Sequence, residues 1–150
     1  MPKNPPDDSP RISPYLYYED AGAALDWLER VFDFQPVVHE RMEAPDGHVI
    51  HAAMRFEEGF VMMGNPGPDY VCAAKSGHRN SQLYIYVDDV DKHCEHTRAQ
   101  GGKIETDLED TFYGDRRYTA EDPEGNHWTF AQRVKDIPPE EWKAPAGTHE

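Results

Sequence analysis

The fold is decided by Gln82-Leu-Tyr-Ile-Tyr-Val-Asp-Asp-Val-Asp91 and by the polar segment that follows it as far as Gly101-Gly102. Successive side chains of an extended chain point to opposite sides, so the apolar side chains at 83, 85 and 87 share one face. Gln82, Tyr84 and Tyr86 share the other face. The apolar face suits packing against a helix, and the polar-aromatic face suits the wall of a ligand cavity. The stretch therefore predicts a strand between a core and a cavity, followed by a helix.

A second copy of this pattern lies 69 residues earlier in the chain. Tyr15-Leu-Tyr-Tyr-Glu-Asp20 matches Tyr84-Ile-Tyr-Val-Asp-Asp89, with identities at both tyrosines and at the final aspartate. Near the far end of the copies, Gly59 corresponds to Gly125 at an offset of 66 residues. Each copy predicts a strand, a helix and three further strands, which we interpret as an internal duplication.

The predicted elements follow from periodicity, caps and turn residues. In the first copy they are a strand from 12, a helix from Asp20 to near Asp33, and strands over 37–42, 48–56 and 60–63. In the second they are a strand over 82–87, a helix over 89–100, and strands over 103–108, 116–121 and 127–132. Asp20 and Asp89 are the predicted helix caps. Asp122-Pro-Glu-Gly125 has the residues that a type I turn prefers.

Composition predicts one ordered region between two tails. Residues 1–11 hold four prolines and two aspartates and are expected to be a disordered tail. The ordered region spans 12–133, as a first module over 12–64, a linker over 65–81 and a second module over 82–133. Residues 134–150 show no strand or helix period and are expected to form a C-terminal tail.

Charge and hydropathy exclude several classes of partner. A net charge of −14 would repel a nucleic-acid backbone, so no nucleic acid is expected. No apolar run approaches the roughly 18 residues that span a bilayer, and the first residues lack the apolar segment of a signal peptide. We therefore expect no membrane and a cytoplasmic location. Cys72 and Cys94 are expected to be reduced thiols.

The duplicated unit resembles the vicinal oxygen chelate superfamily, which includes glyoxalase I, bleomycin-resistance proteins, fosfomycin-resistance enzymes and extradiol dioxygenases. The resemblance is carried by the two strand-to-helix junctions, by Gln100-Gly-Gly102, by Tyr113-Gly-Asp-Arg-Arg-Tyr118 and by Asp122-Pro-Glu-Gly-Asn126. It implies an α+β fold in which two βαβββ modules form an open eight-stranded barrel-like cavity. It also implies a homodimer, because paired units in this group often complete each other's cavity.

Enzymes of this superfamily hold a divalent metal at four positions, two in each module. Carried onto this sequence, the positions are Ser13, Met63, Gln82 and Thr129. None is a histidine or a carboxylate, and a hydroxyl, an amide and a thioether do not compensate for dehydration of a divalent ion. We therefore expect no metal at these positions and no cofactor, although other positions stay open.

The faces of the strands predict which side chains reach the cavity. In the last strand of the first module, Val61 and Met63 are expected on the cavity side and Met62 on the helix side. The predicted ligand-binding residues are Tyr15, Tyr17, His51, Arg55, Gln82, Tyr84, Tyr86, Arg117 and Thr129.

Two of these residues have alternative roles. His51 is the candidate for general acid–base catalysis, and its alternative role is a hydrogen bond within the cavity wall. Arg117 either clamps an anionic group or pairs with the acidic surface.

These observations favour a protein that binds a small organic molecule in a metal-free cavity, as drug- or natural-product-binding proteins of the resistance type do. The alternative is an enzyme of the lyase, isomerase or dioxygenase type that acts on a small oxygenated substrate, with or without a divalent metal. The acidic surface favours a cationic ligand.

Overall fold

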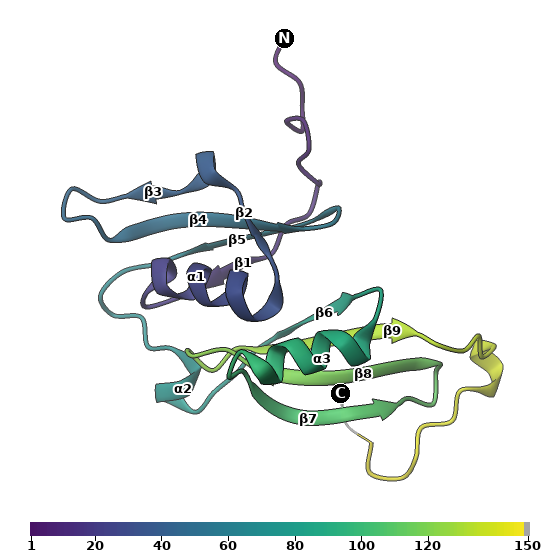
Figure 1. Ribbon diagram of the computed structural model, residues 1–150. Helices are drawn as coiled ribbons and strands as arrows, with labels where there is room; N and C mark the ends of the chain where they lie inside the picture. The colour runs from purple at the N-terminus through teal and green to yellow at the C-terminus, as the bar shows by residue number, and fades with distance from the viewer. Residues whose placement is uncertain (149–150) are drawn as a thin grey trace. The chain divides into compact units, whose positions relative to one another are not determined.

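The computed structural model describes residues 1–148, and its contacts divide the chain into two compact units (Figure 1). The first unit comprises residues 1–78 and 123–125, and the second comprises 79–122 and 126–150. The predicted C-terminal tail falls in the second unit, and its last two residues, 149–150, lie outside the described residues. Each unit contains one sheet and one long helix, which confirms the predicted α+β class.

The sheet of the first unit has the strand order β1-β5-β4-β2, and β3 also pairs with β4. Its helical and extended elements are β1 (Tyr15–Tyr17), α1 (Ala21–Phe32), β2 (Gln35–Pro36), β3 (Met42–Glu43), β4 (Val49–Phe56), β5 (Gly59–Gly64) and α2 (Ala73–Ser76). β1 and β5 are parallel, and β4 and β5 are antiparallel. The short helix α2 lies within the predicted linker.

Helix α1 begins and ends where the sequence indicates. The side chain of Asp20 accepts a hydrogen bond from the backbone N–H of Ala23, so it caps the first turn. Leu28 and Phe32 recur at helical spacing and are fully buried in the core, where α1 packs on β4. The helix ends at Asp33, which adopts a left-handed conformation with φ of 66°.

The predicted strand over 37–42 is wrong. The structure has β2 before this stretch, a 3-10 turn at Val38–Glu40, and β3 after it. Pairing with β4 therefore breaks between Pro36, opposite Met54, and Met42, opposite His51. The turn carries Glu40 out of the ladder and brings its carboxylate to the ring of His51.

The sheet of the second unit has the order β6-β9-β8-β7. Its elements are β6 (Gln82–Tyr86), α3 (Val90–Ala99), β7 (Lys103–Asp110), β8 (Asp115–Glu121) and β9 (His127–Arg133), with a 3-10 turn at Pro139–Glu141. β6 and β9 are parallel, as β1 and β5 are in the first unit. The two sheets thus repeat one topology, as the duplication predicts. Trp128, Phe130 and Tyr118 are fully buried where α3 packs on β8 and β9.

Strand register corrects the predicted face of β5. Tyr84 lies opposite Thr129, which agrees with their predicted place on the cavity face. In the first unit, however, Tyr15 lies opposite Met62, and Leu16 lies opposite Met63. Residues directly opposite in a ladder project from the same face, so Met62 shares the face of Tyr15. Met63 is fully buried on the other face. The prediction was wrong by one residue in this strand because it transferred the glycine offset of 66 residues through a hairpin of different length.

No helix within residues 1–148 combines the length and the apolar character that crossing a bilayer requires.

Candidate functional site

A pocket of about 480 Å³ opens on the sheet of the second unit. Its wall comes from β6, β7, β8 and β9 and from the chain that precedes β6. Three of the predicted ligand-binding residues line it, namely Gln82, Arg117 and Thr129. Its other lining residues include Arg79, Glu105, Glu109 and His127, so charges of both signs face the space.

Gln82 and Thr129 are joined in a hydrogen-bonded row across three strands. The Thr129 hydroxyl donates to Gln82 Oε1 at 2.7 Å and lies 2.9 Å from the Thr119 hydroxyl. These three side chains form hydrogen bonds with one another, and none of them carries a charge. With Met62 in place of Met63, the four positions where the superfamily's enzymes hold their metal still contain no carboxylate or imidazole. The residues at these positions therefore do not fit a divalent ion.

Arg117 forms part of the same wall and is held from two sides. Its Nη1 donates to the Tyr113 hydroxyl at 2.9 Å, and its Nε lies 3.4 Å from Glu109 Oε1. Its side chain is 16% exposed, so an anionic group that enters the pocket can still reach the guanidinium. Arg117 thus pairs with an acidic residue, which is one of the two roles considered for it, and it also faces the pocket, where the clamping of an anionic group stays a prediction.

Tyr84 and Tyr86 project from β6 on the face that carries Gln82, and both rings are partly exposed. Both hydroxyls donate to Asp115 Oδ2, at 2.8 Å and 2.7 Å. Asp115 is completely buried, and Arg133 lies 3.6 Å from its other oxygen. Burial and the bonds to Tyr113 and Asp115 raise the pKa of Tyr84, so its hydroxyl remains protonated. The pair therefore forms a fixed aromatic surface beside the pocket.

The remaining predicted residues lie in the first unit. Tyr15 and Tyr17 border a space of about 340 Å³ with Gly64, Asn65 and Pro66. Arg55 lies over the ring of Phe60, with its guanidinium carbon 5.0 Å from the ring centre. Tyr15 and Tyr17 thus line a smaller pocket, and Arg55 is not among the residues that line it.

His51 is hydrogen-bonded at both ring nitrogens. Its Nδ1 lies 2.9 Å from the Tyr15 hydroxyl, and its Nε2 lies 2.9 Å from Glu40 Oε2. The histidine side chain is only 14% exposed, whereas Tyr15 is 44% exposed. These contacts are hydrogen bonds of the kind that the alternative role of His51 requires, and they also link a carboxylate to an accessible phenol through an imidazole.

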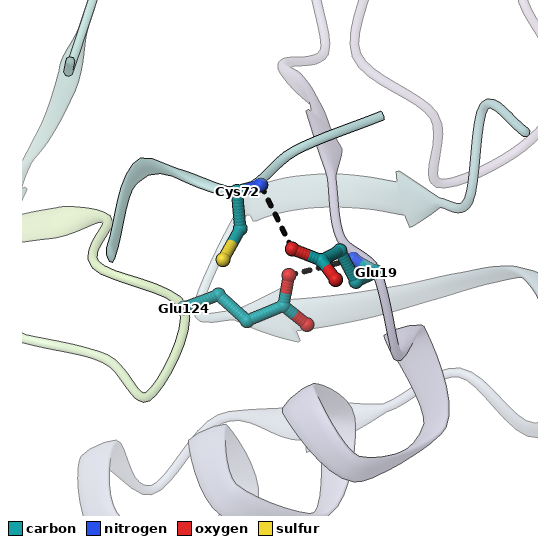
Figure 2. A group of neighbouring side chains, drawn as sticks. All are labelled: Glu19, Cys72 and Glu124. Carbon is teal, nitrogen blue, oxygen red and sulfur yellow. Dashed lines mark hydrogen bonds between the residues drawn. The ribbon is translucent and has the colours of Figure 1, made fainter. Parts of the chain in front are cut away.

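A second group of polar side chains surrounds the junction between β1 and α1 (Figure 2). Glu124 accepts hydrogen bonds from the backbone N–H groups of Glu19, at 2.6 Å, and Asp20, at 2.9 Å. Glu19 accepts from the Cys72 N–H at 2.9 Å and from Lys75 Nζ at 2.6 Å. Burial, and then the bond to Glu19, raises the pKa of the Cys72 thiol. Although these three side chains lie close enough to hold an ion, their carboxylates already bind N–H donors, which indicates a structural role.

The Glu19 carboxylate predicts a specific dependence of stability on acid. Its hydrogen bonds, first with Lys75 and then with Cys72, lower its pKa from the ordinary 4.5 to about 2. A lowered folded-state pKa stabilises the fold fully above pH 4.5, and this contribution disappears as the pH falls toward 2. Glu19→Gln should therefore lower the urea midpoint at pH 6, and the difference from the parent protein should shrink at pH 3. Glu29→Gln, at an exposed position of α1, is the control; an unchanged difference for Glu19→Gln at both pH values would contradict the assignment.

Sequence comparison relates this chain to a known group of proteins. The sequence profile of the Glyoxalase/Bleomycin resistance protein/Dioxygenase superfamily matches residues 11–130. The chain belongs to this superfamily. An uncharacterized protein of Mycobacterium bovis is 35% identical over 141 residues, covering 90% of this chain and 91% of its own. A Mycobacterium tuberculosis relative, also uncharacterized, is 35% identical over 141 residues, covering 90% of this chain and 81% of its own.

Solved structures agree with this superfamily membership. TioX from Micromonospora sp. ML1 is 33% identical, with a TM-score of 0.69, and the match covers 84% of this chain and all of TioX. A glyoxalase/bleomycin resistance protein/dioxygenase family enzyme from Burkholderia phytofirmans is 17% identical, with a TM-score of 0.60, over 80% of this chain and 95% of its own. The second likeness concerns the fold alone.

Three features of the candidate sites of this superfamily member were not predicted from the sequence. Asp115 stood within a quoted motif, but nothing local indicated that β8 would bury it beneath two tyrosines. Glu40 was placed in a strand rather than a turn. His127 begins a predicted strand, but its approach to Glu105 and Glu121 depends on strand pairing that the sequence does not specify. The sequence also predicted a strand that contains Glu121, but it did not predict that Glu121 would approach Glu105 and His127.

Proposed function

We propose that this protein binds a small organic molecule at the pocket of the second unit, as a drug- or natural-product-binding protein of the resistance type. The observation that carries the proposal is the row formed by Gln82, Thr129 and Thr119. In this row, neutral hydrogen bonds engage Gln82 and Thr129, which stand at two of the four positions where the superfamily's enzymes hold a metal. Beside this row, the pocket wall also contains Arg117, which can bind an anionic or polar group of an organic ligand.

The adjoining tyrosines indicate the class of ligand. Tyr84 and Tyr86 present fixed, partly exposed rings, which favour stacking with a planar aromatic group. The net charge of −14 favours the approach of a molecule with a net positive charge. We therefore expect a cationic molecule with an aromatic surface. The cytoplasmic location and the homodimer remain predictions from the sequence.

A thermal-shift titration tests this function. Cationic aromatic antibiotics, bleomycin among them, should raise the melting temperature of dialysed protein progressively with concentration, because a ligand that binds only the folded state stabilises it. Tyr84→Leu should weaken the binding of such an antibiotic by about 2- to 12-fold. This loss corresponds to the roughly 0.5–1.5 kcal/mol that the contact between two aromatic rings contributes.

Tyr84→Phe is the matched control, since it keeps the ring and removes only the hydroxyl that contacts Asp115. It should bind more tightly than Tyr84→Leu. Equal binding by both variants would exclude stacking on this residue, and the absence of any shift across the panel would count against the resistance-type function.

One observation favours the enzymatic alternative, namely the chain from Glu40 through His51 to Tyr15. In such an arrangement a carboxylate orients an imidazole, which can accept a proton from the phenol and return it. Turnover of a glutathione-derived hemithioacetal or of a catechol, reduced in both His51→Ala and Glu40→Gln, would support an enzyme. Turnover that both variants retain would remove His51 from the chemistry.

A further inference from the structure

Three side chains with metal-binding atoms meet at one end of the sheet in the second unit. They are Glu105 on β7, Glu121 at the end of β8 and His127 at the start of β9. Glu121 lies opposite His127 in one ladder and opposite Lys103 in the other. A register shift between Ile104 and Thr106 falls at Glu105. One ligand atom from each member of the trio lies within 4.8 Å of the others.

The ring of His127 contains an unsatisfied nitrogen. Its Nε2 is shielded from solvent and has no hydrogen-bond partner among the described residues. Buried polar atoms in native proteins nearly always have a partner, so this nitrogen calls for one. Burial, and next the charge of Arg79, lowers the pKa of His127, so the imidazole is neutral at physiological pH. A neutral imidazole offers a lone pair to a metal ion.

The two carboxylates already attract a cation. Lys103 Nζ lies 2.7 Å from Glu121 Oε2 and 3.1 Å from Glu105 Oε1. Arg79 Nη1 lies 3.3 Å from the other oxygen of Glu121. The Lys103 side chain is 69% exposed, whereas that of Glu121 is only 12% exposed. The lysine can therefore leave into solvent while the carboxylate stays, because exposed ion pairs of this kind contribute little stability.

We propose that Glu105, Glu121 and His127 bind one divalent transition-metal ion. When the ion is absent, the Lys103 ammonium supplies the positive charge beside the two carboxylates. Two carboxylates and one imidazole suit ions of the Mn²⁺, Fe²⁺, Co²⁺ and Zn²⁺ class. Three protein ligands also leave coordination positions for water or a ligand. Glu105 and His127 line the pocket of about 480 Å³, and Glu121 lies opposite His127 in the ladder between β8 and β9.

This site differs from the superfamily's four positions, which here are Ser13, Met62, Gln82 and Thr129. It also revises the expectation of a metal-free cavity drawn from those positions. The inference does not rest on the proposed binding of an organic molecule, because a metal can bind here with or without that ligand. The two proposals can therefore fail separately.

Titration of EDTA-treated, dialysed protein with Co²⁺ and Zn²⁺ tests the site. Co²⁺ should produce a visible absorption band at one equivalent, and Zn²⁺ should abolish it. His127→Gln should weaken Zn²⁺ binding, measured by calorimetry, at least about tenfold, since changes even outside the ligand set commonly cost 10- to 100-fold. Lys103→Gln should instead tighten Zn²⁺ binding by about two- to fivefold, since it removes the competing ammonium.

Glu109→Gln is the matched control, because Glu109 lines the same pocket but is not one of the trio. It should leave Zn²⁺ affinity within about twofold of the parent protein. If His127→Gln fails to fold in EDTA, Glu121→Gln carries the same test. The proposal is overturned if Co²⁺ gives no band, or if variants of the trio and Glu109→Gln bind Zn²⁺ equally well.

Discussion

Trp128→Ala is expected to lower the free energy of unfolding by about 3–5 kcal/mol, the usual cost of deleting a buried tryptophan side chain. Trp128 is completely buried in β9, and its indole Nε1 donates to Asp122 Oδ2 at 3.0 Å. The substitution removes packing for the core beneath α3 and takes a donor from a buried carboxylate. Urea unfolding followed by circular dichroism measures the loss.

Trp142→Ala provides the comparison within the same unit. Trp142 is 43% exposed and follows the last 3-10 turn, so its removal should cost less than about 1 kcal/mol. Similar losses for the two variants would mean that β9 does not organise the core of the second unit as described.

Gly125→Ala is expected to destabilise the protein by about 2–5 kcal/mol, through two separate costs. Gly125 has a φ of +88°, a conformation that alanine adopts at a cost of about 1–2 kcal/mol. A Cβ there would also lie 2.4 Å from the backbone nitrogen of Ala74, so the backbone of α2 would have to move. The turn could not then keep the hydrogen bond from the Ala74 N–H to the Glu124 carbonyl.

Gly101→Ala separates these two costs. Gly101 has a φ of +82°, but nothing lies within 4 Å of a Cβ built there. Gly101→Ala should therefore lower the free energy of unfolding by only the conformational cost, about 1–2 kcal/mol, in the same urea measurement. An equal loss at both glycines would show that the close approach to α2 contributes nothing.

The sequence predicted what depends on local pattern. Alternation around Tyr84 gave β6 to within one residue, and the two capping aspartates gave the starts of α1 and α3. The duplication at 69 residues predicted that the two units repeat one order of elements, and the two sheets do repeat one topology. These features follow from period, caps and turns, which neighbouring residues determine.

The predictions that were wrong concern residues whose positions depend on contacts with residues distant in the sequence. The 3-10 turn at Val38–Glu40 is accompanied by a contact between Glu40 and His51, eleven residues away. The face of Met63 depended on one residue of hairpin length, because a shift of one residue reverses every side chain of a strand. Asp115 is charged and yet buried, which sequence patterns disfavour unless its partners are known. Candidate sites built from several strands are hidden for the same reason.

Strand β7 also bears on how copies of this chain meet. It is the last strand of its sheet, eight residues long, and an uncovered strand of that length is a template for aggregation. Its sequence, Lys103-Ile-Glu-Thr-Asp-Leu-Glu-Asp110, is charged at five of eight positions, and its ladder with β8 shifts register twice. A second molecule adding a strand here would bring like charges together on an irregular backbone. β7 therefore resists fibre-like growth, and we expect any homodimer to assemble through another surface.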